Sequence, residues 1–164
     1  MKWSQLKKRI EATFAKSVAG RVEVWNTRYR GAHDDAGEAW ITVDGVRVTS
    51  MGACTFGRMY WEESWKLRQD GYCRTRDEAV RRAHERGGFL PSEVNRALFD
   101  YLSLSIDDAI KSDNPIIRAF ATLDRRFGKR RLAEFDDSKE HPLVRTLYRI
   151  RCGAEGIAER KPSA

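Results

Sequence analysis

The sequence of 164 residues has the usual size of one domain, and such a domain buries roughly two-thirds of the surface that its unfolded chain exposes. Hydrophobic residues at 41% and aromatic residues at 10% exclude an intrinsically disordered chain. No run approaches the ~18 apolar residues of a membrane span, and the polar first residues exclude a secretory signal, so we expect a soluble protein without a membrane partner.

The charge is strongly basic, at +7 with a pI of about 9.5. The 31 basic residues comprise 22 Arg and 9 Lys. This excess of Arg suits bidentate contacts to phosphate or carboxylate, although a GC-rich coding bias produces the same excess. The charge therefore indicates an acidic partner, either a nucleic acid or a protein.

A helix over residues 4–18 is predicted first, because apolar side chains recur there at helical spacing and Gly20 is a suitable stop. The stripe consists of Trp3, Leu6, Ile10, Phe14 and Val18. Three strands follow, at residues 21–30, 38–43 and 46–51. With a loop over residues 31–37, they form an antiparallel meander.

The dipeptide Asp44-Gly45 is the strongest turn signal in the chain, because both residues tolerate the positive φ of a type I′ turn. A two-residue turn sets Val43 opposite Val46 and Ile41 opposite Val48. One face of this hairpin is then aliphatic, and we expect a helix to cover it.

The chain after Gly52 is predicted to be helical. A first helix carries Phe56, Tyr60, Glu63 and Leu67 on one side, and Trp61 and Trp65 together on another. We expect these aromatic side chains to be buried, although the helix offers few inward positions and exposure of one of them is the alternative. Thr75 and Glu78 have the spacing of a capping box, and the helix that they open ends at Gly87-Gly88.

Proline marks the start of each later helix. Pro91 opens an apolar stretch that reaches Ile110, with a break at residues 103–105, and Asn114-Pro115 opens a helix that ends at Gly128. Residues 129–135 add a turn or two, and a final helix follows Pro142. The predicted fold is α+β: an N-terminal helix, a three-stranded antiparallel meander and four to five packed helices. We expect a single domain over residues 1–158 and a flexible tail over residues 159–164.

Basic side chains concentrate in two segments. Residues 118–131 hold six basic residues against Asp124, or +5, and the first helix holds five against Glu11, or +4. Clustered cations of this kind bind phosphate backbones by releasing counterions, whereas a solvated helix face with local ion pairs is the simpler explanation. The predicted nucleic-acid-binding residues are Lys7, Lys8, Arg125, Arg126, Lys129, Arg130 and Arg131.

Catalytic and metal chemistry have weaker support. His33-Asp34-Asp35 falls in a predicted loop, yet a metal centre needs further His and Asp ligands, and a polar turn explains the triplet better. Cys54, Cys73 and His84 match no zinc-site spacing. We therefore predict no catalytic residue, metal or cofactor. Three widely spaced cysteines, the third being Cys152, predict no disulfide framework and favour a reducing, cytoplasmic compartment.

Five stretches of the chain resemble a family of short, conserved and uncharacterised bacterial proteins: WSQLKKRI, GRVEVWNTRYR, EAWITVDG, AFATLDRRFGKRRL and HPLVRTLYRIRCGAEGI. The resemblance spans most of the chain and implies a single-domain bacterial cytosolic protein. It implies no activity, cofactor or catalytic residue.

Three functions remain open from the sequence. The first is a non-enzymatic protein that binds DNA or RNA through the two basic segments. The second is a protein-interaction module, such as an accessory subunit or an immunity-like factor, which docks an acidic protein and uses the surplus of Trp and Tyr. The third, a small metal-dependent nuclease, would need His33, Asp34 or Asp35. The sequence does not fix the oligomeric state.

Overall fold

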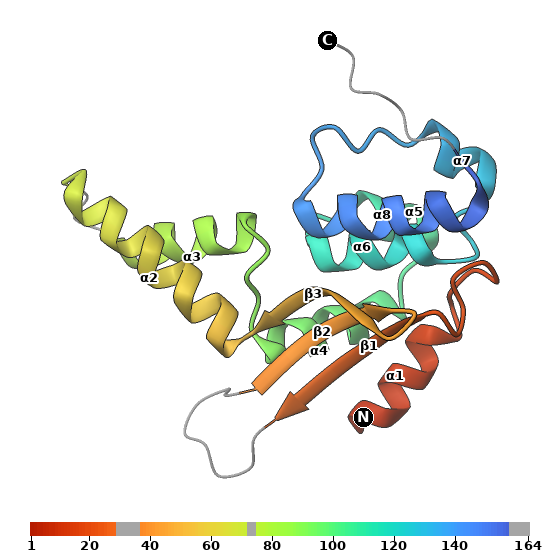
Figure 1. Cartoon of the computed structure of the whole chain (residues 1–164), viewed down its shortest axis with the longest axis horizontal. Coiled ribbons are helices and arrows are strands. Elements are labelled where there is room, and N and C mark those ends of the chain that lie inside the picture. The colour runs from red at the N-terminus through yellow and green to blue at the C-terminus, as the bar shows by residue number, and fades with distance from the viewer. Residues whose placement is uncertain (29–36, 72–74, 158–164) are drawn as a thin grey trace.

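The computed structural model describes residues 1–28, 37–71 and 75–157, and it confirms the predicted α+β order of one helix, three strands and then helices (Figure 1). None of the described helices is long and apolar enough to cross a membrane. In chain order the elements are α1 (Trp3–Glu11), β1 (Val22–Arg28), β2 (Gly37–Val43), β3 (Val46–Gly52), α2 (Ala53–Gln69), α3 (Thr75–Glu85), α4 (Pro91–Tyr101), α5 (Ile106–Lys111), α6 (Pro115–Leu123), α7 (Lys129–Glu134) and α8 (Pro142–Glu155).

The three strands form one antiparallel sheet in the order β1-β2-β3. Asp44 and Gly45 both adopt positive φ, at 50° and 80°, which confirms the two-residue turn. Val43 pairs with Val46 as predicted, but Ile41 pairs with Thr49. Val48 is the extra residue of this β-bulge, so the predicted pairing of Ile41 with Val48 is wrong. Because the bulge turns β3 away from the core, Val46 and Val48 are exposed.

The free edge of β1 is closed by side chains of α1. The amide of Val24 donates to Glu11 Oε1 at 3.0 Å, and the carbonyl of Val24 accepts from Lys7 Nζ at 3.0 Å. A capped edge on β1 and a bulged edge on β3 both oppose the addition of another strand.

The first helix ends at Glu11, so the prediction that it reaches Val18 is wrong. Phe14 instead forms an antiparallel bridge with Asp124. The Ala15 amide donates to the Leu123 carbonyl at 2.9 Å, and the Arg125 amide donates to the Thr13 carbonyl at 2.9 Å. Phe14 and Val18 are nevertheless buried, because the segment after α1 packs on the same core.

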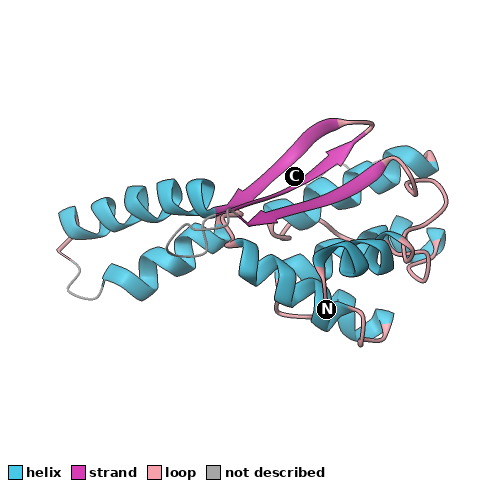
Figure 2. Ribbon diagram, turned by 90° about the horizontal axis from the view of Figure 1, so that it is seen from below, coloured by secondary structure: helices cyan, strands magenta, loops and turns pink. Residues whose placement is uncertain are grey.

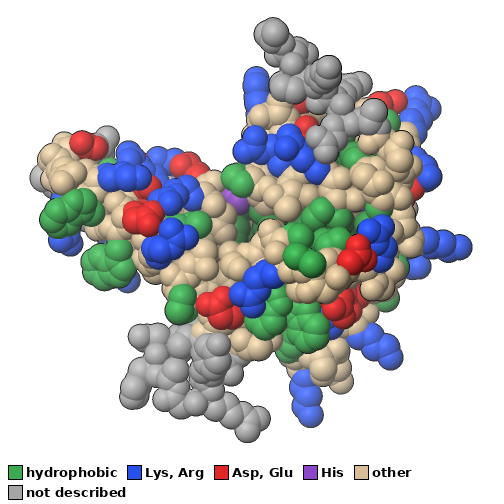
Figure 3. Space-filling model, in the orientation of Figure 1, with side chains coloured by type: hydrophobic (Ala, Val, Ile, Leu, Met, Phe, Trp, Pro, Cys, Tyr) green, Lys and Arg blue, Asp and Glu red, His purple; other side chains and the backbone are tan. Residues whose placement is uncertain are grey.

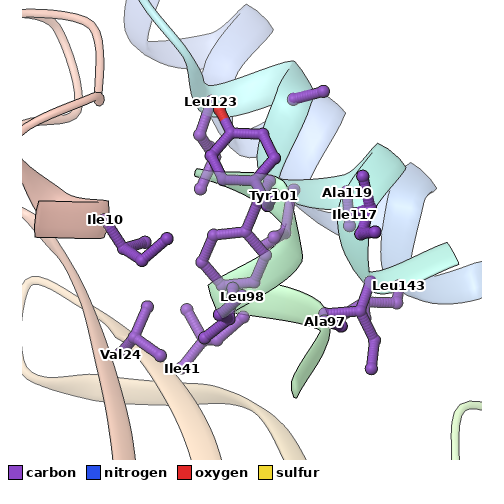
Figure 4. Close-up of a cluster of buried hydrophobic side chains, with 14 of the residues drawn as sticks. Ile10, Val24, Ile41, Ala97, Leu98, Tyr101, Ile117, Ala119, Leu123 and Leu143 are labelled. Carbon is purple, nitrogen blue, oxygen red and sulfur yellow. The ribbon is translucent and has the colours of Figure 1, made fainter. Parts of the chain in front are cut away.

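The hydrophobic core lies between one face of the sheet and the helices α1, α4, α6 and α8 (Figure 2). Ile10, Val24, Ile41, Leu98 and Tyr101 converge from two helices and two strands (Figure 4), and all five are fully buried. α6 is the most buried helix, and it ends at Leu123 because Asp124 leaves the helical conformation. Phe127, predicted to continue that helix, packs instead in a second cluster with Leu132, Tyr148 and Cys152.

α2 and α3 form an antiparallel helical hairpin, here termed the arm, that projects from the rest of the molecule (Figures 1 and 2). Gly52 joins the arm to β3 with φ 152°, and a Cβ there would lie 2.8 Å from the Gly37 carbonyl oxygen. Where the chain leaves α3, also at the base of the arm, it turns at Gly87 and Gly88 as predicted. The side chain of Thr75 lies outside the described part, so its capping box stays a prediction.

His141 connects the base of the arm to the start of α8. Its Nε2 lies 2.7 Å from the carbonyl oxygen of His84, and its Nδ1 accepts the amide of Leu143 at 3.1 Å, which caps α8. Since a carbonyl can only accept, Nε2 carries the proton and the ring is neutral. Burial lowers the pKa of His141 below its ordinary value.

The lowered pKa predicts that acid destabilises the fold. The unfolded chain binds this proton more readily, so stability is complete above about pH 6.5 and declines as the pH falls toward the folded pKa. His141→Asn retains a capping acceptor but does not titrate. We expect it to lower the free energy of unfolding by about 1 kcal/mol at pH 8. It should also give a flatter stability profile between pH 7 and pH 5 in urea titrations. Parallel profiles for the two proteins would contradict the role of His141.

Candidate functional site

The two basic segments predicted from the sequence do lie next to each other. The bridge between Phe14 and Asp124 joins the residues after α1 directly to the residues after α6. Arg125 is exposed, and its amide is bonded to the carbonyl of Thr13, one helical turn from Lys8 and Arg9. Chain folding therefore brings part of each segment to one junction.

Most of the predicted nucleic-acid-binding residues are nevertheless paired with carboxylates. Five of the seven form ion pairs: Lys7 with Glu11 at 2.7 Å, Arg126 with Asp124 at 2.8 Å, Lys129 with Glu155 at 2.8 Å, Arg130 with Glu134 at 3.2 Å and Arg131 with Asp107 at 2.6 Å. Lys8 and Arg125 have no such partner among residues 1–28, 37–71 and 75–157. Local pairing thus cancels much of the positive field that the sequence count suggested.

Arg126 is partly exposed, but its guanidinium is bound to a buried polar cluster. Asp124 is fully buried at the end of α6 and accepts bonds from the Tyr101 hydroxyl and from the backbone and guanidinium of Arg126. Burial first, and then Asp124, raise the pKa of Tyr101 above its ordinary range, and Asp124 raises the pKa of Arg126. The buried guanidinium of Arg151 donates to the Leu123 and Asp124 carbonyls. These contacts are those of a structural cluster.

Glu155 organises a second group of cations at the end of α8. Its carboxylate accepts from Ser17 at 2.6 Å and Arg151 at 2.9 Å, and it pairs with Lys129. Lys129 and Ser17 contribute most to lowering the pKa of Glu155 to about 2. The position of Lys129, predicted to contact phosphate, is thus fixed by an acidic neighbour.

The arm exposes two tryptophan side chains. Trp61 and Trp65 are each 64% exposed on α2, so the prediction that they are buried is wrong. Hydrophobic side chains stand out from the arm in the space-filling view (Figure 3). The face of α2 that is buried carries Glu63, Ser64 and Leu67, and Trp61 and Trp65 lie outside this face.

Ion pairs hold the two helices of the arm together. Glu63 is buried and accepts from Lys66 at 2.9 Å and from Arg86 at 2.8 Å, while Arg86 also bonds Glu62 at 2.7 Å. These cations lower the pKa of Glu62 and of Glu63. The ion pairs with Arg86 lie on the side of α2 that faces α3, and the two tryptophans are on a different side of the helix.

An open cavity of about 320 Å³ lies where the arm meets α4 and α6. His84 and Glu93 line it and bond each other at 3.1 Å, with Phe89 stacked on His84 at 5.4 Å. Within the described ranges, no group of three or more His, Cys, Asp or Glu side chains could hold a metal ion. Cys54 is exposed, and the triplet His33-Asp34-Asp35 and Cys73 lie outside the described residues.

Comparison with known proteins identifies a family but no characterised relative. The model of the SF0329 protein family matches residues 2–152. No curated protein and no solved structure matches the chain.

The buried cluster around Asp124 yields a test of its structural role. Asp124→Ala leaves the Tyr101 hydroxyl and the Arg126 guanidinium without their acceptor, so we expect it to lower the free energy of unfolding by about 3 kcal/mol. Asp107→Ala removes the partner of Arg131 at the surface, and it should lower the free energy of unfolding by less than about 1 kcal/mol. Equal losses of stability in urea titrations would contradict this assignment.

Proposed function

The chain belongs to the SF0329 protein family, and we propose that it is a non-enzymatic protein-interaction module whose arm docks an acidic protein. The observation that carries this proposal is the exposure of Trp61 and Trp65 on a projecting helix. Tryptophan and arginine are enriched among the residues that dominate the energy of protein interfaces, and tryptophan loses much surface to a partner at little entropic cost. Solvated indoles on a protruding element are thus suited to desolvation by a second protein.

The charge beside the tryptophans sets the chemistry of the partner. Arg58, Lys66 and Arg68 lie on the same helix, and Arg68 has no acidic partner within the described part of the chain. The whole protein carries +7. An acidic partner would approach faster under this field, and its carboxylates would meet exposed guanidinium groups.

Loss of the two indoles should abolish partner capture. We expect immobilised wild-type protein, after nuclease treatment, to retain a stoichiometric acidic protein from a lysate of its native host, and Trp61→Gln/Trp65→Gln to lose it. Phe99→Gln is the matched control, because Phe99 is 50% exposed on α4, outside the arm. Mass spectrometry identifies the retained protein, and circular dichroism checks that each variant is folded. Capture that survives in the arm variant would refute the proposal.

Binding of a nucleic acid is the second candidate function, favoured by the contact between the two basic segments. Lys8, Arg9 and Lys16 flank Thr13, whose carbonyl accepts the Arg125 amide; all three are exposed, and none of them has an acidic partner among the described residues. Of the seven residues predicted from the sequence, Lys8 and Arg125 are the ones whose charges are available to phosphate. Such a patch would bind duplex or single strands without sequence preference.

Charge reversal at the junction tests this second function. If it holds, Lys8→Glu/Arg125→Glu weakens duplex binding at least about tenfold at low salt and lowers the slope of log affinity against log salt by about two. Lys111→Glu/Lys139→Glu makes the same change of charge near the other end of α6 and should have little effect. Fluorescence anisotropy with labelled DNA and RNA measures the affinity of each variant. Equal weakening by the two variants would show a general charge effect and exclude a phosphate site at the junction.

A further inference from the structure

Five of the exposed residues of α2 follow a regular pattern. Cys54, Arg58, Trp61, Trp65 and Arg68 are all exposed, and they are separated by four, three, four and three residues. This alternation is the spacing of the a and d positions of a coiled coil, which align in one seam along a helix. α2 therefore has an outward seam in addition to the face with Ser64 and Leu67 that packs on α3.

From this seam we infer that the partner contributes a single α-helix, which packs lengthwise on α2. The contact face of this helix carries small residues at its middle and a carboxylate at each of its two ends. The inference rests on the proposed docking function and specifies its partner. Two helices pack along such seams by placing each side chain in a hole formed by the facing helix. A partner loop or strand would not match a row of side chains with this alternation.

The size of the seam residues specifies the centre of the partner helix. Two indoles four residues apart fill the space at the middle of the seam, so the facing positions must be small. Alanine, glycine or serine at two positions four apart would leave room for Trp61 and Trp65.

The ends of the seam specify the charges. Arg58 lies three residues before Trp61, and Arg68 lies three residues after Trp65. The guanidinium of Arg58 bonds Glu62 at 3.2 Å yet remains 62% exposed, and Arg68 has no acidic partner in the described ranges. A carboxylate of the partner would therefore pair with each Arg in a bidentate manner.

The same symmetry excludes a second copy of this chain as the occupant. Arg58 and Arg68 are equally far from the centre of the seam, so antiparallel pairing of two α2 helices sets Arg58 against Arg68 of the other copy. Parallel pairing sets each Arg against itself. Like charges in a seam oppose association, so the seam selects a different chain with acidic residues at these positions.

Two synthetic helical peptides test this inference. Both carry Ala at the two central seam positions and differ only at the seam ends, which are Glu in one peptide and Lys in the other. Titration followed by tryptophan fluorescence should show that the Glu peptide binds the wild-type protein at least about tenfold more tightly, equivalent to about 1.4 kcal/mol. Arg58→Glu/Arg68→Glu should reverse this preference, whereas the matched variant Lys111→Glu/Lys139→Glu should keep it.

Each other outcome overturns the inference. Equal binding of the two peptides, binding of neither, or a preference that Arg58→Glu/Arg68→Glu leaves unchanged would show that α2 does not select an acid-ended helix. The proposed docking function would survive those results if Trp61→Gln/Trp65→Gln still abolished capture of the acidic protein. It would fail, independently of the peptides, if that variant captured the protein normally.

Discussion

The packing of the N-terminal segment against α4, α6 and α8 depends on the contacts of one buried residue, Asp124. It ends α6, receives the Tyr101 hydroxyl from α4 and neutralises Arg126. Its backbone pairs with Phe14, and its carbonyl accepts from Arg151 of α8. A carboxylate in the interior is stable only when every oxygen is bonded, so these partners must assemble together. The N-terminal segment, α4, α6 and α8 are thereby held at one point.

This constraint also changes how the charge of the molecule should be interpreted. The basic residues near Asp124 are numerous because several of them compensate buried or half-buried acids, as Arg126 does for Asp124 and Lys129 does for Glu155. A formal count along the chain cannot distinguish a cation that holds the fold from one that faces solvent. Cations available for binding are those without such acids, and among the described residues of α2 Arg68, three residues after Trp65, is one of them.

Local signals in the sequence were sufficient to predict where several helices and the hairpin turn begin. They were insufficient to predict which residues those elements contact. Proline at residues 91, 115 and 142 and the turn at Asp44-Gly45 act through backbone geometry alone, so they predicted element starts correctly. The end of α1 at Glu11 depends on a partner more than a hundred residues away, and the bulge at Val48 depends on strand register. The exposure of Trp61 depends on which face of α2 packs on α3, and the pattern within α2 alone does not determine that face.

The base of the arm explains how a projecting hairpin can present a defined surface. Gly88 passes so close to α2 that a Cβ would lie 2.9 Å from the sulfur of Met59 and 3.4 Å from the Cα of Phe56. Rings from four segments then stack in sequence, from Phe56 through His84 and Phe89 to His141. This row joins α2 and α3 to the cap of α8, and Gly52 fixes the other attachment at β3. Because both chain connections of the arm are held at its base, a partner helix would lose little affinity to ordering α2. The energy of burying the two indoles would then be available for binding.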